Sequence, residues 1–416
     1  MNLRTLEPSN PRTHSFHITH HCTTMGARTG VLQTPHGEIE TPNFIFCATK
    51  AAIKGLAPDV MKRAGSNIIL SNLYHLMLQP GADVIERQGG LHDFMRWQGP
   101  MLTDSGGYQV FAMQFGGISD EVKGRNKAAR PNTVIDITEE GVIFQSYIDG
   151  RKILLTSETS MYMQRQLGAD LIMAFDECTA FHHSKDYQIA ALARSNRWGM
   201  RSLEAFTKQN SDGKQALYGI VQGAHYQDLR ESAMQDVTAL PYFGTAVGGS
   251  FGKSKEDLYS IIKWCAPLHK PERPVHLLGV GDIADIFVGI KYGIDTFDCV
   301  QPTRLGRHGV ALMPSENGGR LNLRNARFRD DKTPLDPEHH HEFTSHFTRG
   351  YLHHLIKAEE MLGMQILVEH NVAVMNRLMR DIRHGIRTGT LEKVESEWLS
   401  NACAVDTTKT YGSAPN

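Results

Sequence analysis

Short apolar segments recur along the chain, and each of them ends in polar or glycine-rich residues. Together they are rich in Ile, Val and Leu and apolar on both faces, which is typical of strands buried in a parallel sheet. The segments are SNIILSN (66–72), PMLTDSGG (100–107), DLIMAFDE (170–177), ALYGIVQG (216–223), GTAVGG (244–249), VHLLGVGD (275–282) and GIDTFDC (293–299).

Helical patterns lie between these segments. Ser160–Gly168 has a capped start and a glycine stop, Lys253–Cys265 has apolar residues near helical spacing, and Ile283–Gly293 again ends in glycine. Alternating strands and helices predict βα units around a parallel sheet. No GxGxxG motif follows the first of these strands, which weakens the interpretation as a dinucleotide-binding fold.

Such a sheet can close into a barrel or stay open and doubly wound. The unusual polar residues stand at the C-terminal ends of many different strands, and these ends converge on one site in a barrel. An open sheet places its ligand at one switch point instead. We therefore predict an α/β fold, a (β/α)8 TIM barrel, as a single domain over residues 1–416, with a frayed tail at 408–416.

Composition narrows the function classes. Of the 416 residues, 40% are hydrophobic and 21% are charged, which is typical of a globular protein. The formal net charge is −1, so any surface for nucleic acid must be a local patch. No apolar run reaches the roughly 20 residues of a membrane span, and the start of the chain lacks the apolar core of a signal peptide. Six scattered cysteines form no CxxC pair, so we expect a cytoplasmic protein without membrane association.

Polar or glycine residues that are suited to binding or catalysis stand at the ends of five of the predicted strands. They are Asp104 with Ser105, Gly106 and Gly107, then Asp176, Gln222, Gly248 with Gly249, and Asp298. A carboxamide and a carboxylate suit the edge of a purine-like base, which offers donors and acceptors. Two further carboxylates suit glycosidic-bond chemistry, one as nucleophile and one as general acid/base. A single Asp at a strand end is often only a helix cap, but five such features at one pole favour a common site.

Motifs in order along the chain resemble the tRNA-guanine transglycosylases, from about residue 16 to about residue 388. The TDSGG, FDEC and DCV-PTR-GR motifs carry the resemblance most specifically. The full set is TPNFIF (41–46), NLYHL (72–76), GGLHDFM (89–95), TDSGGYQVF (103–111), GADLIMAFDEC (168–178), GIVQG (219–223), LGVGD (278–282), DTFDCVQPTRLGR (295–307) and NLRNARF (322–328).

This resemblance implies a TIM-barrel enzyme that exchanges the wobble guanine of tRNAs with GUN-type anticodons for a free 7-deazaguanine base. By matching motif positions, Asp298 resembles the nucleophile and Asp104 the general acid/base. The implied base-binding residues are Asp104, Ser105, Gly106, Gly107, Tyr108, Asp176, Gln222 and Gly249, with Tyr108 as the stacking platform. A covalent ester would hold the tRNA while one base leaves and another enters, and the target base must first be unstacked.

The resemblance also implies two RNA-binding segments. One comprises Gly279, Val280, Gly281, Asp282, Ile283, Ala284 and Asp285, and the other Thr303, Arg304, Leu305, Gly306 and Arg307. Four arginines downstream could hold phosphates or form a solvated loop; they are Arg320, Arg324, Arg327 and Arg329. The basic run at 123–130 is a weaker candidate.

Residues 248–253 depart from the family pattern. They read GGSFGK, whereas bacterial members often read GGLAVGE, so the loop is one residue shorter and ends in Lys253 instead of an acid. Bacterial members usually insert an aminomethyl precursor base, and a lysine is a poor neighbour for its cationic amine. A shorter loop with the small Ser250 could admit the bulkier base queuine. We therefore expect queuine salvage, with neutral drift of the loop as the alternative.

A second departure lies in PLDPEHHHEFTSH, within a subdomain at about 330–390. The three cysteines of the family's zinc loop fall at His339, His341 and Thr344, and the distal histidine is His370. Thiolates hold structural zinc in closed tetrahedral sites, whereas three imidazoles usually leave a position open. Either His339, His341 and His370 bind zinc weakly or side-chain packing has replaced the metal, and the reaction itself should require no cofactor.

Tyr351–Leu362 opens a predicted amphipathic helical region beside this loop, where we expect a homodimer interface. Two rival functions remain. A non-catalytic partner subunit of the same family should lack the nucleophile, and the presence of Asp298 and Asp104 argues against that role. The archaeal branch carries additional C-terminal RNA-binding domains. Whether Cys178 takes part in the chemistry or is a small residue packed beneath the base is left open.

Overall fold

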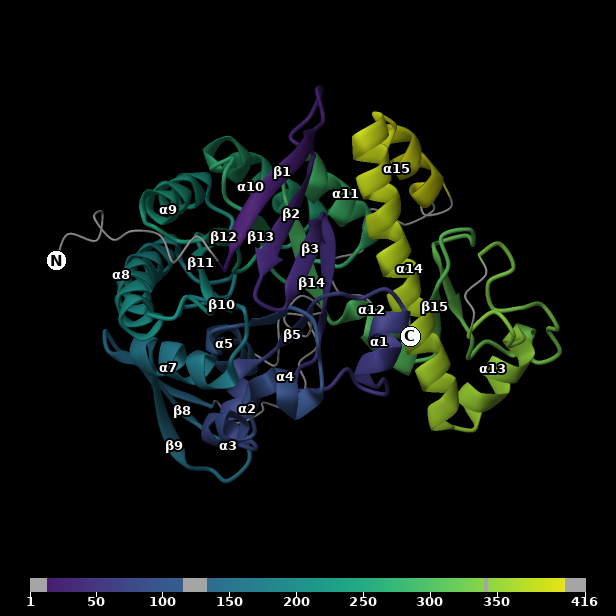
Figure 1. Ribbon diagram of the computed structural model, residues 1–416, viewed down its shortest axis with the longest axis horizontal. Coiled ribbons are helices and arrows are strands. Elements are labelled where there is room, and N and C mark those ends of the chain that lie inside the picture. Colours follow the sequence, from purple (N-terminus) through teal and green to yellow (C-terminus); the bar gives the residue numbers. More distant parts are fainter. Residues whose placement is uncertain (1–12, 115–132, 340–342, 401–416) are drawn as a thin grey trace.

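The computed structural model describes residues 13–114, 133–339 and 343–400. Eight parallel strands close into a barrel in the order β10-β11-β12-β13-β14-β4-β5-β6, which confirms the predicted (β/α)8 TIM barrel (Figure 1). Seven of them lie in the predicted segments, and β4 lies in the TPNFIF motif. The barrel strands are β4 (Asn43–Cys47), β5 (Ile69–Ser71), β6 (Met101–Thr103), β10 (Leu171–Met173), β11 (Ala216–Val221), β12 (Gly244–Val247), β13 (Val275–Leu277) and β14 (Thr296–Cys299).

Helices surround the barrel, and all three helical patterns are confirmed. A capping box at Thr156 begins α7, and Gly168 ends it in the left-handed conformation. The helices and 3-10 turns from α1 to α12 are α1 (Pro58–Arg63), α2 (Leu73–Leu78), α3 (Ala82–Arg87), α4 (Gly90–Met95), α5 (Gly107–Gln114), α7 (Ser157–Leu167), α8 (Lys185–Gln209), α9 (Gln227–Ala239), α10 (Lys255–Cys265), η2 (Ala266–Leu268), α11 (Ile283–Lys291) and α12 (Gln301–Arg307).

Small antiparallel sheets are attached to the barrel, in the orders β1-β2-β3, β7-β8-β9 and β15-β16. Leu32 of β2 and Ile39 of β3 join the apolar cluster inside the barrel, so the first sheet closes one end of it. The strands are β1 (Ser15–His21), β2 (Arg28–Thr34), β3 (Gly37–Thr41), β7 (Val134–Ile137), β8 (Gly141–Gln145), β9 (Lys152–Thr156), β15 (Val310–Leu312) and β16 (Arg320–Asn322).

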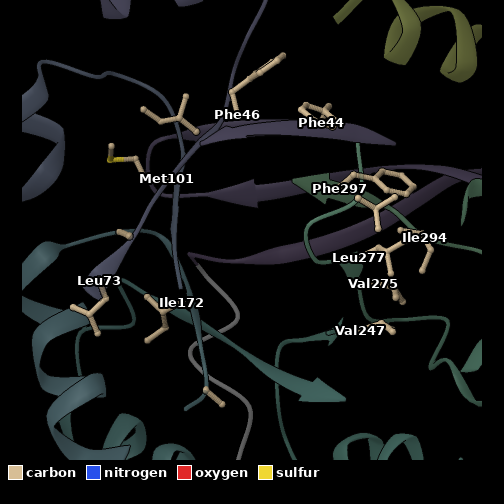
Figure 2. Close-up of a cluster of buried hydrophobic side chains, with 14 of the residues drawn as sticks. Phe44, Phe46, Leu73, Met101, Ile172, Val247, Val275, Leu277, Ile294 and Phe297 are labelled. Atoms are coloured by element: carbon tan, nitrogen blue, oxygen red, sulfur yellow. The ribbon is translucent and has the colours of Figure 1, made fainter. Parts of the chain in front are cut away.

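Side chains of the barrel strands alternate between two apolar clusters. Phe44 and Phe297 belong to the large cluster between strands and helices (Figure 2). Ile45, between Phe44 and Phe46, belongs to the second cluster, inside the barrel. Because successive side chains on a strand point to opposite faces, Asp298 points into the barrel, as does its register partner Ile45 on β4.

A helical region follows the barrel and packs along its side, as α14 does against α12 and β4 (Figure 1). It comprises α13 (Arg349–Lys357), α14 (Met361–Thr388) and α15 (Leu391–Leu399), with the short turn η3 (Ala326–Phe328) before it. The predicted helical region is confirmed, with a break at Glu359, whose φ is +60°. No helix within the described ranges is long and apolar enough to cross a membrane.

Two histidines converge on one buried carboxylate just before β10. Asp170 Oδ1 lies 2.6 Å from His36 Nδ1, and its Oδ2 lies 3.2 Å from His92 Nε2. His92 Nε2 also lies 3.1 Å from the carbonyl oxygen of Gly99. A nitrogen between two acceptors carries a proton, so this trio is a hydrogen-bonded cluster rather than a set of metal ligands.

The cluster shifts the acidity of its members. Burial opposes charge on Asp170, but the hydrogen bonds from His36 and His92 prevail and lower its pKa to about 2. The same bond to Asp170 raises the pKa of His36 above 6.5. Each shift favours the charged form in the folded state, so the pair stabilises the fold where both groups are charged.

Replacing Asp170 with Asn should lower the melting temperature by about 3 °C near pH 5. The contribution of Asp170 to the free energy of unfolding is lost as pH falls from 3.8 toward its folded pKa of about 2. The contribution of His36 to the same free energy is lost as pH rises from 6.5 through its raised folded pKa. Calorimetry of both proteins from about pH 3 to pH 8 checks this, with the exposed Asp149→Asn as control. A difference that does not vary with pH would contradict it.

Candidate active site

The polar strand ends predicted from the sequence meet at one mouth of the barrel. Asp104 follows β6, Asp176 follows β10, Gln222 follows β11 and Gly249 follows β12, while Asp298 lies within β14. Because the strands are parallel, these positions share the C-terminal end of the barrel. The charge of Asp298 acts on Asp104, and that of Asp104 acts on Asp176, so the carboxyl groups form one electrostatic unit.

Asp298 is held asymmetrically. Its Oδ1 accepts the backbone N–H of Gly279 at 3.0 Å and lies 3.1 Å from His276 Nε2. Its Oδ2 lies 3.6 Å from Cys47 Sγ, a weak donor. Gly279 directs its N–H at the carboxylate from a left-handed conformation with a φ of +74°. One carboxylate oxygen is therefore fixed, and the other keeps its lone pairs for a reaction.

Asp104 is held by amides. Asn72 Nδ2 and Gln109 Nε2 each donate to Oδ2 at 2.5 Å, and the backbone N–H of Leu73 donates to Oδ1 at 2.8 Å. Burial raises the pKa of Asp104 above its ordinary value against these hydrogen bonds, and the charge of Asp298 adds to the rise. A carboxyl group with a raised pKa takes up a proton more readily than an ordinary carboxyl group, as a general acid/base must.

Asp176 and Gln222 form a polar wall that begins beside Asp104, because β10 pairs with β6. Gln222 Nε2 donates to Asp176 Oδ2, and Ser105 Oγ donates to Oδ1 at 3.4 Å. Burial raises the pKa of Asp176 to about 6, although both hydrogen bonds oppose the rise. Gln222 Oε1 is buried and has no hydrogen-bond partner within the described part of the chain. Because an unsatisfied buried acceptor is costly, this oxygen is suited to a donor on a bound ligand.

Gly249 adjoins this polar wall, at a position where a larger residue would be crowded and strained. A Cβ at this position would lie 2.1 Å from Gln222 Oε1. Its φ of +79° also lies in the left-handed region. Backbone and carboxamide therefore approach the same space, where both can meet a flat ligand.

Tyr108 and Cys178 border the site differently. Tyr108 is the second residue of α5, directly after Gly107, and it is 45% exposed, so its ring is accessible for stacking. Cys178 is 8% exposed and belongs to the main apolar cluster. Glu177 is turned away from the site, because Arg194 Nη1 and Tyr187 Oη bond its carboxylate at 2.5 and 2.7 Å.

Sequence reasoning missed three residues that hold the site: Asn72, Arg230 and His276. Arg230 lies on α9, is fully buried, and donates to the carbonyl groups of Val221, Gly248 and Ser250 at 3.0, 2.7 and 2.8 Å. It thereby ties the loop after β11 to the loop after β12. The sequence signal that could have identified Arg230 is its charge among the largely apolar residues on the buried face of α9.

The two predicted RNA-binding segments flank Asp298. Residues 279–285 lead from β13 into α11, and residues 303–307 lie in α12 directly after β14. Asp282 caps α11, and Asp285 is buried and accepts the Tyr259 hydroxyl at 2.9 Å, so both stabilise the local fold. Arg304 is exposed and Arg307 partly exposed, which leaves two cations beside the mouth.

Further basic side chains lie beyond α12. Arg324, Arg327 and Arg329 are exposed, whereas Arg320 Nη2 lies 3.6 Å from Asp282 Oδ2. The basic run at 123–130 falls outside the described residues. Arg324 adjoins the cationic surface that Arg304 and Arg307 begin, because the charges of all three arginines act on His308.

The region that matches the family's zinc loop offers no thiolate among its described residues. His370 is buried, and its Nε2 lies 2.9 Å from the carbonyl oxygen of Leu312, which makes this nitrogen a donor. His339 Nδ1 lies 3.5 Å from Asp336 Oδ2, and Thr344 is buried. His341 falls outside the described residues. The donors that are described do not fit a closed, thiolate-ligated zinc site.

Packing holds this subdomain together. The side chain of Asn371 accepts the N–H of Leu312 at 2.7 Å and donates to the carbonyl groups of Pro302 and Val310 at 2.9 and 3.0 Å. A separate apolar cluster fills the interior. Its buried members are Ala311, Met313, Leu321, Leu323, Phe328, Leu335, Leu352, Leu355, Ile356, Ile366 and Leu367.

Comparison with known proteins agrees with this geometry. The sequence profile of a family described as queuine tRNA-ribosyltransferase matches residues 22–403. A queuine tRNA-ribosyltransferase from Roseiflexus sp. (strain RS-1) is 44% identical over 385 residues, which cover 90% of this chain and 96% of the relative.

Two further relatives carry the same description. The protein from Pelotomaculum thermopropionicum is 40% identical over 386 residues, covering 92% of this chain and 98% of the relative. The protein from Synechococcus sp. (strain CC9605) is 41% identical over 384 residues, covering 92% of this chain and 96% of the relative. The profile match and these identities, over nearly the whole chain, show that it belongs to the queuine tRNA-ribosyltransferase family.

Proposed function

We propose that this tRNA-guanine transglycosylase replaces the wobble guanine of GUN-type anticodons with a 7-deazaguanine base through an ester between Asp298 and the ribose. The activity named for its relatives supports the reaction class. The observation that carries the mechanism is the asymmetric setting of Asp298. Its Oδ1 is held by two partners at 3.0 and 3.1 Å, while among the described residues Oδ2 meets only a thiol, at 3.6 Å.

The first half-reaction uses both separately held carboxyl groups. Oδ2 of Asp298 attacks the anomeric carbon of the ribose, and the bond from that carbon to guanine breaks with its electron pair leaving on the base. Asp104, whose pKa burial raises, protonates the departing base. In the second half-reaction Asp104 accepts a proton from the incoming base, which attacks the same carbon and releases Asp298.

The polar wall supplies base recognition. Gln222 Oε1 and the Asp176 carboxyl group face the site with acceptor capacity, which suits the N–H groups on the edge of guanine or deazaguanine. The backbone N–H of Gly249 would donate to the base carbonyl, and Tyr108 would stack on its face. A base must leave the anticodon stack to enter this mouth.

The partner is tRNA, held by a local cationic surface. Arg304 and Arg307 lie directly beyond Asp298, and three exposed arginines continue the surface downstream. Such side chains position phosphates without reading sequence. We place the reaction in the cytoplasm. We assign it no cofactor, because the carboxyl groups of Asp104 and Asp298 supply the acid, the base and the nucleophile.

The loop after β12 favours queuine as the incoming base. Ser250 is small and 5% exposed, and the Arg230 guanidinium holds its carbonyl group at 2.8 Å. Lys253 Nζ lies 5.1 Å from the centre of the Phe181 ring, which holds a cation beside this loop. We infer that the small Ser250 side chain suits a bulky substituent on the base, and that the Lys253 charge repels the ammonium group of the precursor base.

A second copy of the chain is the expected partner of α13 and α14. Exposed apolar side chains gather there, with Met361 76%, Tyr351 42% and Leu362 39% exposed. The rings of Phe347 and Tyr351 stack with their centroids 5.9 Å apart. A homodimer would cover this apolar surface.

Replacing Asp298 with Ala should reduce incorporation of labelled guanine into tRNA by about 10³-fold or more, because the attacking oxygen is lost. It should also abolish the covalent enzyme–tRNA adduct on denaturing gels. The exposed Asp149→Asn serves as a folded control with native activity. Continued exchange by the Asp298 variant would exclude the ester mechanism.

Given both free bases at equal concentration, the native enzyme should incorporate queuine at least about tenfold faster than the aminomethyl precursor. Lys253→Glu should narrow this ratio, because a carboxylate attracts the precursor's amine. Lys263→Glu, which reverses an exposed charge on α10, is the control. Native preference for the precursor would overturn the assignment of queuine.

Light scattering should give the mass of two chains for the native protein. Met361→Asp should shift it toward one chain, because the new charge would be buried in the interface. Ile189→Asp alters a side chain on α8 that is 46% exposed and should leave the mass unchanged. A native protein that is monomeric at micromolar concentration would refute the dimer.

A further inference from the structure

His276 occupies the middle of β13 and points into the barrel. Its neighbours Val275 and Leu277 belong to the cluster between strands and helices (Figure 2), so His276 faces the opposite way. It is 0% exposed, and its register partner on β14 is Thr296. A histidine in this position must find partners for both ring nitrogens.

Both partners come from the inward face of β14. His276 Nδ1 lies 2.9 Å from Thr296 Oγ1, and Nε2 lies 3.1 Å from Asp298 Oδ1. A carboxylate only accepts, so Nε2 carries the proton and Nδ1 accepts the Thr296 hydroxyl. The imidazole thus spans two successive inward side chains of the neighbouring strand.

This contact matters because it distinguishes the two oxygens of Asp298. In the ester, Oδ2 is bonded to the ribose and Oδ1 becomes a carbonyl oxygen, which is a weaker acceptor than a carboxylate. When the incoming base attacks, the bond from the anomeric carbon to Oδ2 breaks and its electron pair returns to the carboxylate. Hydrogen bonds to Oδ1 then strengthen, because they again meet an ionised acceptor.

We propose that His276 is a positioning residue that holds Asp298 and stabilises its carboxylate as the leaving group of the second half-reaction. The inference rests on the ester mechanism proposed above. The hydrogen bond from His276 to Oδ1 of Asp298 is stronger in the free carboxylate than in the ester. This bond therefore favours release of tRNA over formation of the adduct. His276 therefore sets the balance between the two half-reactions.

The test separates those half-reactions. The covalent adduct is formed with labelled tRNA, freed of guanine by rapid desalting, and chased with excess queuine while release is followed on denaturing gels. His276→Leu should release tRNA about tenfold more slowly than the native enzyme, and more adduct should accumulate at steady state. His276→Gln places an amide N–H near Nε2 and should restore release to within about threefold.

A second variant covers the case in which His276→Leu fails to fold. Thr296→Val keeps the shape of the strand and removes the hydroxyl that fixes the ring, so release should slow by about threefold. Thr245→Val makes the same change at a buried threonine of β12 that is paired with Val275, and it should behave as native.

The outcomes are distinct. If the native enzyme forms no adduct, the ester mechanism itself is wrong. If the native enzyme forms the adduct but the His276→Leu or Thr296→Val variant releases tRNA at the native rate, the proposed role of His276 is wrong. Equal slowing by His276→Leu and His276→Gln would also overturn that role, because it would show that side-chain shape, rather than the hydrogen bond, controls release.

Discussion

Closure of the barrel between β14 and β4 is the constraint on which the site depends. In the observed register Asp298 pairs with Ile45, and Phe297 pairs with Phe44. A slip of one residue would turn Asp298 toward the helices and Phe297 into the barrel. The aromatic side chains prevent this slip, because they fill the cluster beneath the helices (Figure 2). The pattern that forms the fold therefore also directs Asp298, the proposed nucleophile, inward.

The two ends of the barrel surround their carboxylates with different donors. At the N-terminal end Asp170 meets two histidines, and Asp295 makes an ion pair with Arg28 in which Nη2 lies 2.6 Å from Oδ2. At the C-terminal end the donors to Asp104 and Asp176 are amides, a hydroxyl and a backbone N–H. The histidine hydrogen bonds outweigh burial at Asp170 and lower its pKa to about 2, whereas burial raises the pKa of Asp295 despite Arg28. The neutral donors around Asp176 do not outweigh burial, so its pKa rises to about 6.

Most of the barrel was predictable from its sequence because apolar runs and glycine stops are local signals. β4 was the exception, because it was not predicted as a separate strand. Only Pro42 separates it from the preceding strand β3. The acidic strand ends were predictable for the same reason as the strands. His276 was not, because its role comes from Asp298, which a strand-pairing register brings close from 22 positions away. Arg230 likewise depends on three carbonyl groups in two other segments.

The C-terminal subdomain matters beyond its own loop, because α14 is joined to the candidate active site. Asn371 bonds the carbonyl group of Pro302 in α12, the helix that directly follows Asp298. A Cβ at Gly306 would lie 2.7 Å from the backbone nitrogen of Val368, so α12 and α14 approach at backbone distance. This close packing fixes the helix that presents Arg304 beside Asp298. Side-chain amides and tight helix contact therefore hold this edge of the candidate site in place.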